Sequence, residues 1–340
     1  MLSPVPFERR PAAQAACGLG AVQTIKNPMS NSRDSRHPMP RQQTVLSPAL
    51  VAVLSELGLG QVRALHDIAV RPIEGHSNLV YAIEAGPRRL ACRFLSGRPD
   101  GHGADERRAS EQAWRLGIGA HPVLIDHRRG IAVTRWIEGA KPVSGRLLRS
   151  DVSRLRQAFG LIARFHARAL GIRHAIDIGG AVAGAVDKAQ NQKVLPSFWQ
   201  EMARPYARAL RRLENARTLA PSHGDPTPGN FLEAGGRLRL IDWEYAGLAP
   251  AAWDFGYLAF EAGMDAREAC RVLASVQTGH NTSRGPLRCA DIADAMFIAG
   301  ILNTIWYVRA AGDGAPPDEE PDFRWRRLRL LARQLPGTWR

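Results

Sequence analysis

The sequence predicts an α+β protein with two lobes: a small antiparallel sheet with one helix, then a larger, mainly helical lobe. Short runs of β-branched and apolar residues, broken by glycine and proline, predict the sheet between residues 69 and 137. Segments with apolar residues at helical spacing dominate after residue 150 and predict the second lobe. With 340 residues and 45% hydrophobic residues, the chain can bury a core of this size. The expected bounds are 47–137 for the N-lobe, 138–142 for the hinge and 143–340 for the C-lobe.

Residues 1–46 differ from the rest of the chain. They are rich in Pro, Ser, Asn, Gln and Arg, and Glu8 and Asp34 are their only acids. Such a composition does not bury enough apolar surface to order itself, so we expect a disordered N-terminal extension. Two alternatives stay open: an organellar transit peptide, or a start codon placed too early, with Met29 or Met39 as the true start.

The N-lobe begins with a short helix expected at 47–57, where Ser47 is the cap and Pro48 lies in the first turn. Alternating apolar runs between turn residues predict the strands, and a longer amphipathic stretch that ends at Gly117 predicts the helix. The expected strands are 71–74, 79–83, 89–95, 123–126 and 130–137, and the expected helix is 105–116.

The C-lobe opens with Ser150 and Asp151, which predict the cap of a long amphipathic helix. Two short strands are expected at 231–232 and 238–241. The expected helices are 152–170, 196–217, 254–262, 266–277, 290–310 and 323–335. The last of these is basic. We expect it to pack Trp325 on the large lobe and to keep its arginines in solvent, with membrane-surface binding as the alternative.

The charge balance is strongly basic, with 46 Lys and Arg against 32 Asp and Glu, a formal net charge of +14. Such a balance raises nucleic acid as a partner. Only four of the basic residues are lysines, and no dense basic block interleaves with aromatic residues before the C-terminus. We interpret the charge as arginine usage in a genome rich in G and C, and expect no specific nucleic-acid partner.

The four cysteines, Cys17, Cys92, Cys270 and Cys289, show no C-x-x-C spacing. This argues against a zinc site or a disulfide framework and favours a reducing, cytoplasmic compartment. No uninterrupted apolar run approaches the roughly 18 residues that a membrane span needs, so we expect no transmembrane segment. The oligomeric state is left open.

Two neighbouring segments carry the chemistry, Ser222–Asn230 and Leu240–Gly247. The first places Asp225 and Asn230 on one loop, and the second adds Asp242 at the end of a strand. Phosphoryl transfer needs a base beside an acceptor hydroxyl and metal ions that bridge the nucleotide phosphates. Mg²⁺ prefers oxygen ligands, so an amide and a carboxylate of this kind are suitable.

These motifs resemble the aminoglycoside phosphotransferase superfamily, on its choline/ethanolamine kinase-like branch, which has a protein-kinase-like two-lobed fold. The resemblance runs from about Ile73 to about Ala310 and includes Glu74–Asn78 and Val133–Gly139 in the same order. It implies an ATP- and Mg²⁺-dependent transferase for a small-molecule acceptor. By this resemblance Asp225 is the catalytic base, His223 orients its loop, and the Mg²⁺ ligands are Asn230 and Asp242.

The nucleotide-binding residues expected in the N-lobe depart from the protein-kinase pattern. No lysine lies between Asn27 and Ala140, and Arg93 stands at the position of the usual lysine, as in the choline kinase-like branch. An arginine fork can hold phosphate oxygens in two directions. Glu106 is the expected partner of Arg93, with Glu111 as the alternative. The turn residues Ser77 and Asn78 are expected to cover the phosphates.

The acceptor site is expected to be acidic and aromatic, because acids and aromatic residues crowd the stretch from 221 to 268. The candidate acceptor residues are Glu244, Tyr245, Trp253 and Trp306. They favour a small cationic amino alcohol, such as choline or ethanolamine. Choline kinases carry two tryptophans one turn apart where this chain has Gly300 and Asn303, which favours a larger or less methylated acceptor.

Three alternatives stay open: a thiamine kinase, an aminoglycoside- or macrolide-type antibiotic phosphotransferase, and a catalytically silent regulator with the same fold. The presence of Asp225, Asn230 and Asp242 disfavours the regulator.

Overall fold

The computed structural model describes residues 53–58, 68–73, 79–94, 103–216, 218–277, 287–312 and 321–335. The chain divides into the units Met1–Val45 and Leu46–Arg340, and every described residue belongs to the second. The expected extension 1–46 lies outside the described residues. Of the helix expected at 47–57, residues 53–56 are helical and 47–52 are not described.

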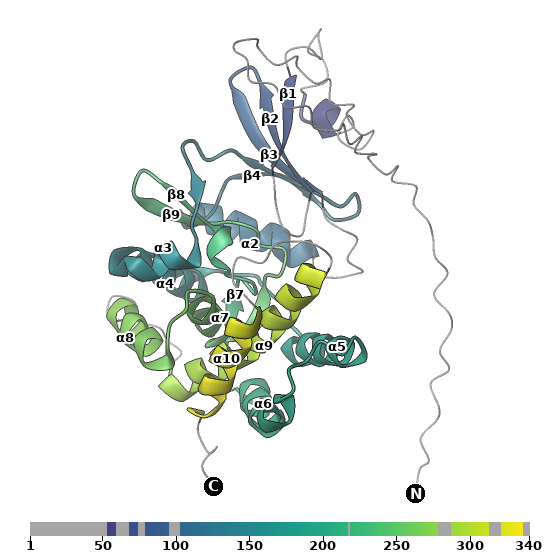
Figure 1. The fold of residues 1–340 in the computed structure, drawn as a ribbon. Coiled ribbons are helices and arrows are strands. Elements are labelled where there is room, and N and C mark those ends of the chain that lie inside the picture. The colour runs from purple at the N-terminus through teal and green to yellow at the C-terminus, as the bar shows by residue number, and fades with distance from the viewer. Residues whose placement is uncertain are drawn as a thin grey trace, which may run out of the picture. The chain divides into compact units, whose positions relative to one another are not determined.

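A five-stranded antiparallel sheet forms the N-lobe, in the order β1-β2-β3-β5-β4 (Figure 1). The strands are β1 Ile68–Ile73, β2 Leu79–Ala85, β3 Arg88–Phe94, β4 Pro122–Asp126 and β5 Ile131–Arg135. Alternate residues such as Leu90 and Cys92 on β3 are buried in a small core with Val53 and Leu54. Successive side chains of a strand point to opposite faces of the sheet, so Arg93 lies on the face opposite Cys92.

The helix of the N-lobe, α2 Gly103–Arg115, packs on the C-lobe. Its Ala109 and Ala113 are fully buried in the large hydrophobic core, together with Ile118 beyond the helix end. The backbone N–H of Leu240 also donates to the carbonyl of Ile118 at 2.9 Å. The small side chains therefore let the second half of α2 approach the C-lobe closely.

Eight α-helices of the described C-lobe surround one large core, to which Ala109, Ala113 and Ile118 also belong. They are α3 Gly145–Ser150, α4 Val152–Arg168, α5 Ile178–Asn191, α6 Trp199–Glu214, α7 Trp253–Glu261, α8 Ala266–Gln277, α9 Cys289–Gly312 and α10 Pro321–Ala332. Asp151 caps α4 as expected, because its carboxylate accepts from the N–H groups of Ser153 and Arg154. Helices α3 and α5 were not predicted from the sequence.

Short strands frame the loop that follows α6. β7 Leu219–Ser222 pairs with β10 Gly247–Pro250, and β8 Phe231–Ala234 forms a hairpin with β9 Arg237–Leu240. β6 Lys141–Pro142 adds an edge to that hairpin. The hairpin was expected, whereas β6, β7 and β10 were missed. The segment 223–230 therefore leaves one sheet and enters another, which fixes both of its ends.

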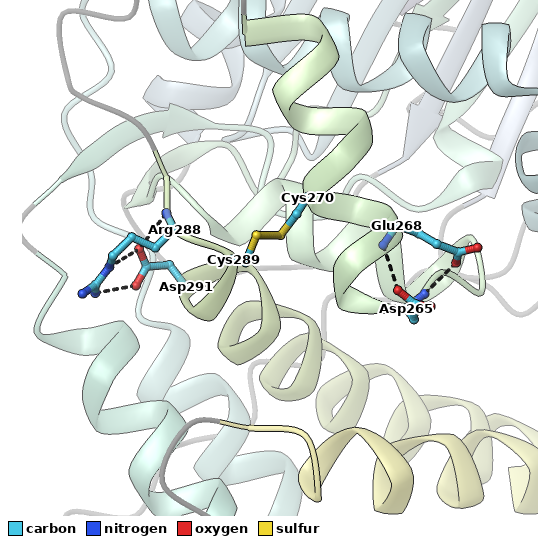
Figure 2. The surroundings of a disulfide bond; sticks show 6 residues. All are labelled: Asp265, Glu268, Cys270, Arg288, Cys289 and Asp291. Carbon is cyan, nitrogen blue, oxygen red and sulfur yellow. Dashed lines mark hydrogen bonds and ion pairs between the residues drawn. A yellow bond between two sulfur atoms is a disulfide. The ribbon is translucent and has the colours of Figure 1, made fainter.

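Cys270 and Cys289 form a disulfide that joins α8 to the first residue of α9 (Figure 2). The expectation of no disulfide framework did not foresee this bridge. The two residues are 19 positions apart in sequence but their Cα atoms are 5.6 Å apart, which is a normal disulfide separation. Arg288 and Asp291 form a bidentate ion pair near the bridge, at the start of α9.

Helix α9 is long and apolar enough to pass a length and composition test for a membrane span, over Cys289–Ala310. However, 72% of its apolar window is buried inside the protein. Its hydrophobicity is thus accounted for by the core that it forms with α7 and α10.

Helix α10 lies along α9 and buries Trp325, Leu328 and Leu331, as expected for a packed terminal helix (Figure 1). The expectation that its arginines are solvated is wrong for Arg324, which is buried.

Candidate active site

Asp254, in the first turn of α7, holds the loop that follows β7. The carboxylate of Asp254 accepts from the backbone N–H groups of His223 and Gly224, at 2.7 and 3.0 Å. Gly224 has φ +89°, and a Cβ there would lie 2.3 Å from the carbonyl oxygen of Tyr245, so only glycine fits. The indole N–H of Trp253 donates to the Gly224 carbonyl at 2.9 Å. Asp254 therefore ties down this loop.

The partners of Asp254 offset the effect of burial on its carboxyl. Burial would raise the pKa of its carboxyl, but hydrogen bonds from His166 and from the loop, with the charge interactions of His166 and His223, hold that pKa below its usual value. His166 lies 2.8 Å from Asp254 through Nε2. A buried carboxylate satisfied from several sides thus fixes the loop that carries Asp225.

His223 spans the distance between the loop and the strand β9. Its Nε2 lies 2.9 Å from the carbonyl of Ile241, which can only accept, so Nε2 carries the hydrogen. Its Nδ1 then accepts from the backbone N–H of Asp225 at 3.2 Å. Burial lowers the pKa of His223, against the opposing pull of Asp254, and the ring is neutral. His223 therefore links the two loops and orients the backbone at Asp225.

Asp225 and Asn230 face each other across the same loop. The side-chain amide of Asn230 donates to the carbonyl of Asp225 at 2.9 Å, which leaves its Oδ1 as the atom that could bind a cation. The backbone N–H of Ile241 donates to the carbonyl of Asn230, also at 2.9 Å. This bond brings the residue before Asp242 next to Asn230. The backbone of the Asp242 loop is therefore joined to that of the Asp225 loop at Asn230.

Asp242 has a left-handed backbone, with φ +66°. This conformation is uncommon for residues other than glycine, although Asp and Asn adopt it more readily than most. Backbone strain of this kind clusters at functional sites. The turn directs the Asp242 carboxylate toward Arg93 of β3, and the two side chains are in contact.

Arg93 is surrounded by three carboxylates. Its guanidinium contacts Glu106 on α2 and Asp242, and Glu244 lies 3.6 Å away. Glu111, the alternative partner, instead pairs with Arg107 at 3.2 Å. His127 also lies 3.4 Å from the second oxygen of Glu106. The site thus joins a fork-shaped cation from the sheet with acids from the helix and the C-lobe, and its net charge is negative.

The position of Glu106 is set by its neighbour Asp105. The buried carboxylate of Asp105 accepts from the backbone N–H groups of Arg173 and His174, at 3.0 and 2.5 Å. Arg108 completes the contact, because it reaches both Asp105 and the carbonyl of Gly171. The first turn of α2 is therefore anchored to the C-lobe, and so is the carboxylate that holds Arg93.

The candidate acceptor residues lie in different surroundings. Glu244 is beside Arg93, and Tyr245 packs against the Gly224 turn. Trp253 is buried, with its N–H used by the loop, whereas Trp306 is 40% exposed and contacts Tyr307 edge to face. The expected phosphate-covering residues Ser77 and Asn78 lie outside the described residues.

A buried chain of hydrogen-bonded polar side chains behind Asp225 was not recognised from the sequence. The Tyr257 hydroxyl contacts Oδ1 of Asp225 and lies 2.8 Å from Oδ1 of Asn303. The Asn303 amide donates to Glu261 at 2.9 Å, and Glu261 is paired with Arg324. A detectable signal did exist: Asp254, Tyr257 and Glu261 follow one face of α7 at helical spacing.

The sheet with its anchored helix, the helical lobe and the loops that carry Asp225 and Asp242 together form a two-lobed, kinase-like fold. The model of the phosphotransferase enzyme family matches residues 69–290, more than half of the chain. The chain therefore belongs to that family, and the expected resemblance is confirmed.

Among curated proteins, the chain is similar to Protein LicA of Haemophilus influenzae (strain ATCC 51907 / DSM 11121 / KW20 / Rd). The two are 25% identical over 162 residues, which cover 44% of this chain and 57% of that protein. The chain spans about half the length of the curated relatives it matches.

Solved structures show the same fold. A choline/ethanolamine kinase family protein from Mesorhizobium loti has a TM-score of 0.63 at 23% identity, covering 85% of this chain and 96% of that one. The choline kinase LicA from Streptococcus pneumoniae has a TM-score of 0.64 at 18% identity, covering 83% and 99%. The expected two-lobed α+β fold is confirmed.

Proposed function

We propose that the protein is an ATP-dependent kinase that transfers the γ-phosphoryl group to the hydroxyl of a small amino alcohol. One observation carries the proposal: Asp225, Asn230 and Asp242 lie on two loops joined by hydrogen bonds, and Arg93 contacts the last of them. Base, metal-binding oxygens and a phosphate-binding cation are then present in one place. A solved relative in complex with AMP, the protein called LicA, supports nucleotide as the donor.

The residues present fit Mg²⁺. Among the described residues, no group of three or more His, Cys, Asp or Glu side chains is arranged to hold a metal ion. An Asn230 oxygen and the Asp242 carboxylate would supply the small set of oxygen ligands that Mg²⁺ takes from proteins, and phosphates and water would supply the rest. When bound, Mg²⁺ would neutralise charge on the transferred phosphoryl group.

Each side chain has one task in the transfer. Asp225 accepts the proton of the acceptor hydroxyl while the hydroxyl oxygen bonds to the γ-phosphorus and the bond to the β,γ-bridging oxygen breaks, releasing ADP. Arg93 holds phosphate oxygens, and Glu106 keeps its guanidinium in place. Neutral His223 orients the backbone at Asp225 and takes no proton.

The acceptor that suits this site is less methylated than choline. A Cβ on Gly300 would lie 2.6 Å from Phe260 and 2.7 Å from Leu328, so that position has no room for an aromatic wall. Asn303 is bonded to Tyr257 and Glu261 instead of presenting a ring. Trp243 and Trp253 are buried in the core. Polar groups beside Asp225 favour an acceptor that has N–H donors, such as ethanolamine.

Acceptor-dependent ADP release against a panel tests the proposal. The panel contains ethanolamine, choline, thiamine, homoserine, an aminoglycoside and a macrolide, with Asp225→Asn as the matched inactive control. We expect the highest kcat/KM for a primary amino alcohol. Preference for thiamine or an antibiotic would replace the acceptor class, and the absence of phosphorylation with every acceptor would favour a silent regulator.

A further inference from the structure

The hydroxyl of Tyr257 touches the residue assigned as the base, although nothing in the proposed chemistry uses a tyrosine. Tyr257 lies in the middle of α7, and its ring is buried against Trp253. Its hydroxyl contacts Oδ1 of Asp225 on one side and lies 2.8 Å from Oδ1 of Asn303 on the other. The phenol is therefore fixed between an element of the core and the catalytic loop.

The hydrogen of the Tyr257 hydroxyl belongs on the Asp225 side. Burial and the charges of Asp225 and Glu261 raise the pKa of Tyr257 well above its usual value, so the phenol stays protonated and remains a donor. One hydrogen serves one acceptor at a time, and an ionised carboxylate is a stronger acceptor than an amide oxygen. Tyr257 thus donates to Asp225 whenever the base is ready to accept a proton.

The groups behind Tyr257 fix the direction of its hydroxyl. Glu261 is an acceptor only, so the Asn303 amide turns its NH₂ group to Glu261 at 2.9 Å and its oxygen to Tyr257. Arg324 pairs with Glu261, and its guanidinium stacks on the Tyr307 ring at 4.2 Å. The chain of contacts runs from Arg324 on α10 to Glu261 on α7, then through Asn303 on α9 back to Tyr257 on α7. The Glu261 and Arg324 side chains are only 4% and 3% exposed.

We propose that Tyr257 is a positioning residue that holds Oδ1 of Asp225. The carboxylate then keeps one orientation about its Cβ–Cγ bond and offers Oδ2 to the acceptor hydroxyl. Asn303, Glu261 and Arg324 keep Tyr257 in the required orientation. This proposal rests on the assignment of Asp225 as the base. A carboxylate held at one oxygen loses the freedom to rotate about Cβ–Cγ, and catalysis depends steeply on such alignment.

Tyr257→Phe tests the proposal because it keeps the buried ring and removes only the hydroxyl. We expect kcat to fall about 10- to 100-fold, in line with the loss of a hydrogen bond to a charged group, while KM for ATP and for the acceptor stay within about twofold. Calorimetric binding of nucleotide without acceptor should be unchanged. Tyr206→Phe on α6, a tyrosine that stacks on Trp199, is the matched control and should retain wild-type kcat.

Epistasis with Asp225 decides how Tyr257 acts. If Tyr257 works only through the base, Tyr257→Phe should cost little in the Asp225→Asn background, and the double variant should resemble Asp225→Asn alone. Losses that multiply in the double variant would overturn the proposal. So would a wild-type kcat for Tyr257→Phe. An Asp225→Asn enzyme at full rate would instead remove the proposed base itself, which separates the two failures.

Asn303→Ala provides a second variant if Tyr257→Phe does not fold. It leaves the Tyr257 ring in place and removes the amide behind the hydroxyl, so we expect a smaller loss, about 3- to 10-fold in kcat with unchanged KM. That loss should also vanish in the Asp225→Asn background. Wild-type kcat for Asn303→Ala, with Tyr257→Phe unfolded, would count against the proposal.

Discussion

Arg93 contacts Asp242, although the first lies on a strand of the N-lobe and the second on a loop of the C-lobe. The contact brings the proposed phosphate-binding cation to the proposed metal-binding carboxylate. Glu106 reaches the same guanidinium from α2, whose first turn Asp105 anchors to the C-lobe. The two lobes are therefore bridged by the groups that the proposed transfer uses, and the predictions below test them in turn.

Replacement of Arg93 separates geometry from charge. Arg93→Lys should raise KM for ATP about 5- to 10-fold, because a point charge cannot hold Glu106 and phosphate oxygens in a fork. Arg93→Ala should also lower kcat, and the Arg93→Lys, Glu106→Gln double variant should lose less than the sum of the two single losses. Steady-state kinetics measure all three. Strictly additive free energies would show that Glu106 does not act through Arg93.

Replacement of Asp242 addresses the metal site. Asp242→Asn keeps the left-handed turn, which asparagine tolerates, and removes one charged ligand. We expect the Mg²⁺ concentration needed for half-maximal nucleotide binding to rise by more than about tenfold. Calorimetric titrations of nucleotide at a series of Mg²⁺ concentrations measure it. An unchanged dependence on Mg²⁺ would place the metal elsewhere.

The buried pair of Arg324 and Glu261 should matter for folding stability. Removal of one partner leaves an uncompensated charge in the core, so Arg324→Ala should lower the free energy of unfolding by about 3–5 kcal/mol. Arg329 on α10 and Glu201 on α6 form a bidentate ion pair, with side chains 38% and 51% exposed. Arg329→Ala should cost about 0–1 kcal/mol. Urea unfolding compares them, and equal losses would contradict the buried pair's importance.

The low pKa of His223 predicts loss of stability in mild acid. Burial depresses that pKa in the folded state, so below the ordinary histidine pKa of about 6.5 the unfolded chain binds a proton that the folded chain does not. The free energy of unfolding should therefore fall as the pH drops below about 6.5, at up to about 1.4 kcal/mol per pH unit from this group. His223→Asn should flatten this slope between pH 6.5 and 5. An identical slope in the variant would assign the effect to other groups.

The lowered pKa of Asp254 acts in the same direction at lower pH. Its contribution to stability is complete above the ordinary aspartate pKa of about 3.9 and is lost as the pH falls through the folded-state value.

The candidate catalytic loops were predictable because their groups lie close together in sequence. Asp225 and Asn230 fall within one short motif, and Asp242 falls within a second motif shortly after it. The family resemblance adds Arg93 and Glu106, whose contact in the structure agrees with the expected pairing. The helix 178–191 was missed because Gly179, Gly180 and Gly184 lower its helix propensity, so its formation depends on packing with α9.

The groups behind Asp225 could not be placed from sequence. Tyr257, Asn303 and Arg324 lie on three helices, and only tertiary packing brings them together. Arg324 was predicted to be solvated like the other arginines of α10. The spacing of residues along α10 does not reveal that Arg324 pairs with the buried Glu261. The disulfide was not predicted for the same reason, because no local motif relates Cys270 to Cys289.

Mass-spectrometric or ³¹P detection of the phosphorylated acceptor, comparing wild type with Asp225→Asn, tests the central claim most directly. With Mg²⁺, ATP and the best amino alcohol of the panel, the wild-type protein should form one phosphomonoester per ADP released. Asp225→Asn should bind nucleotide with unchanged affinity and form product about 10²- to 10⁴-fold more slowly. Equal product formation by the two proteins would contradict the account, because Asp225 would then not be the base.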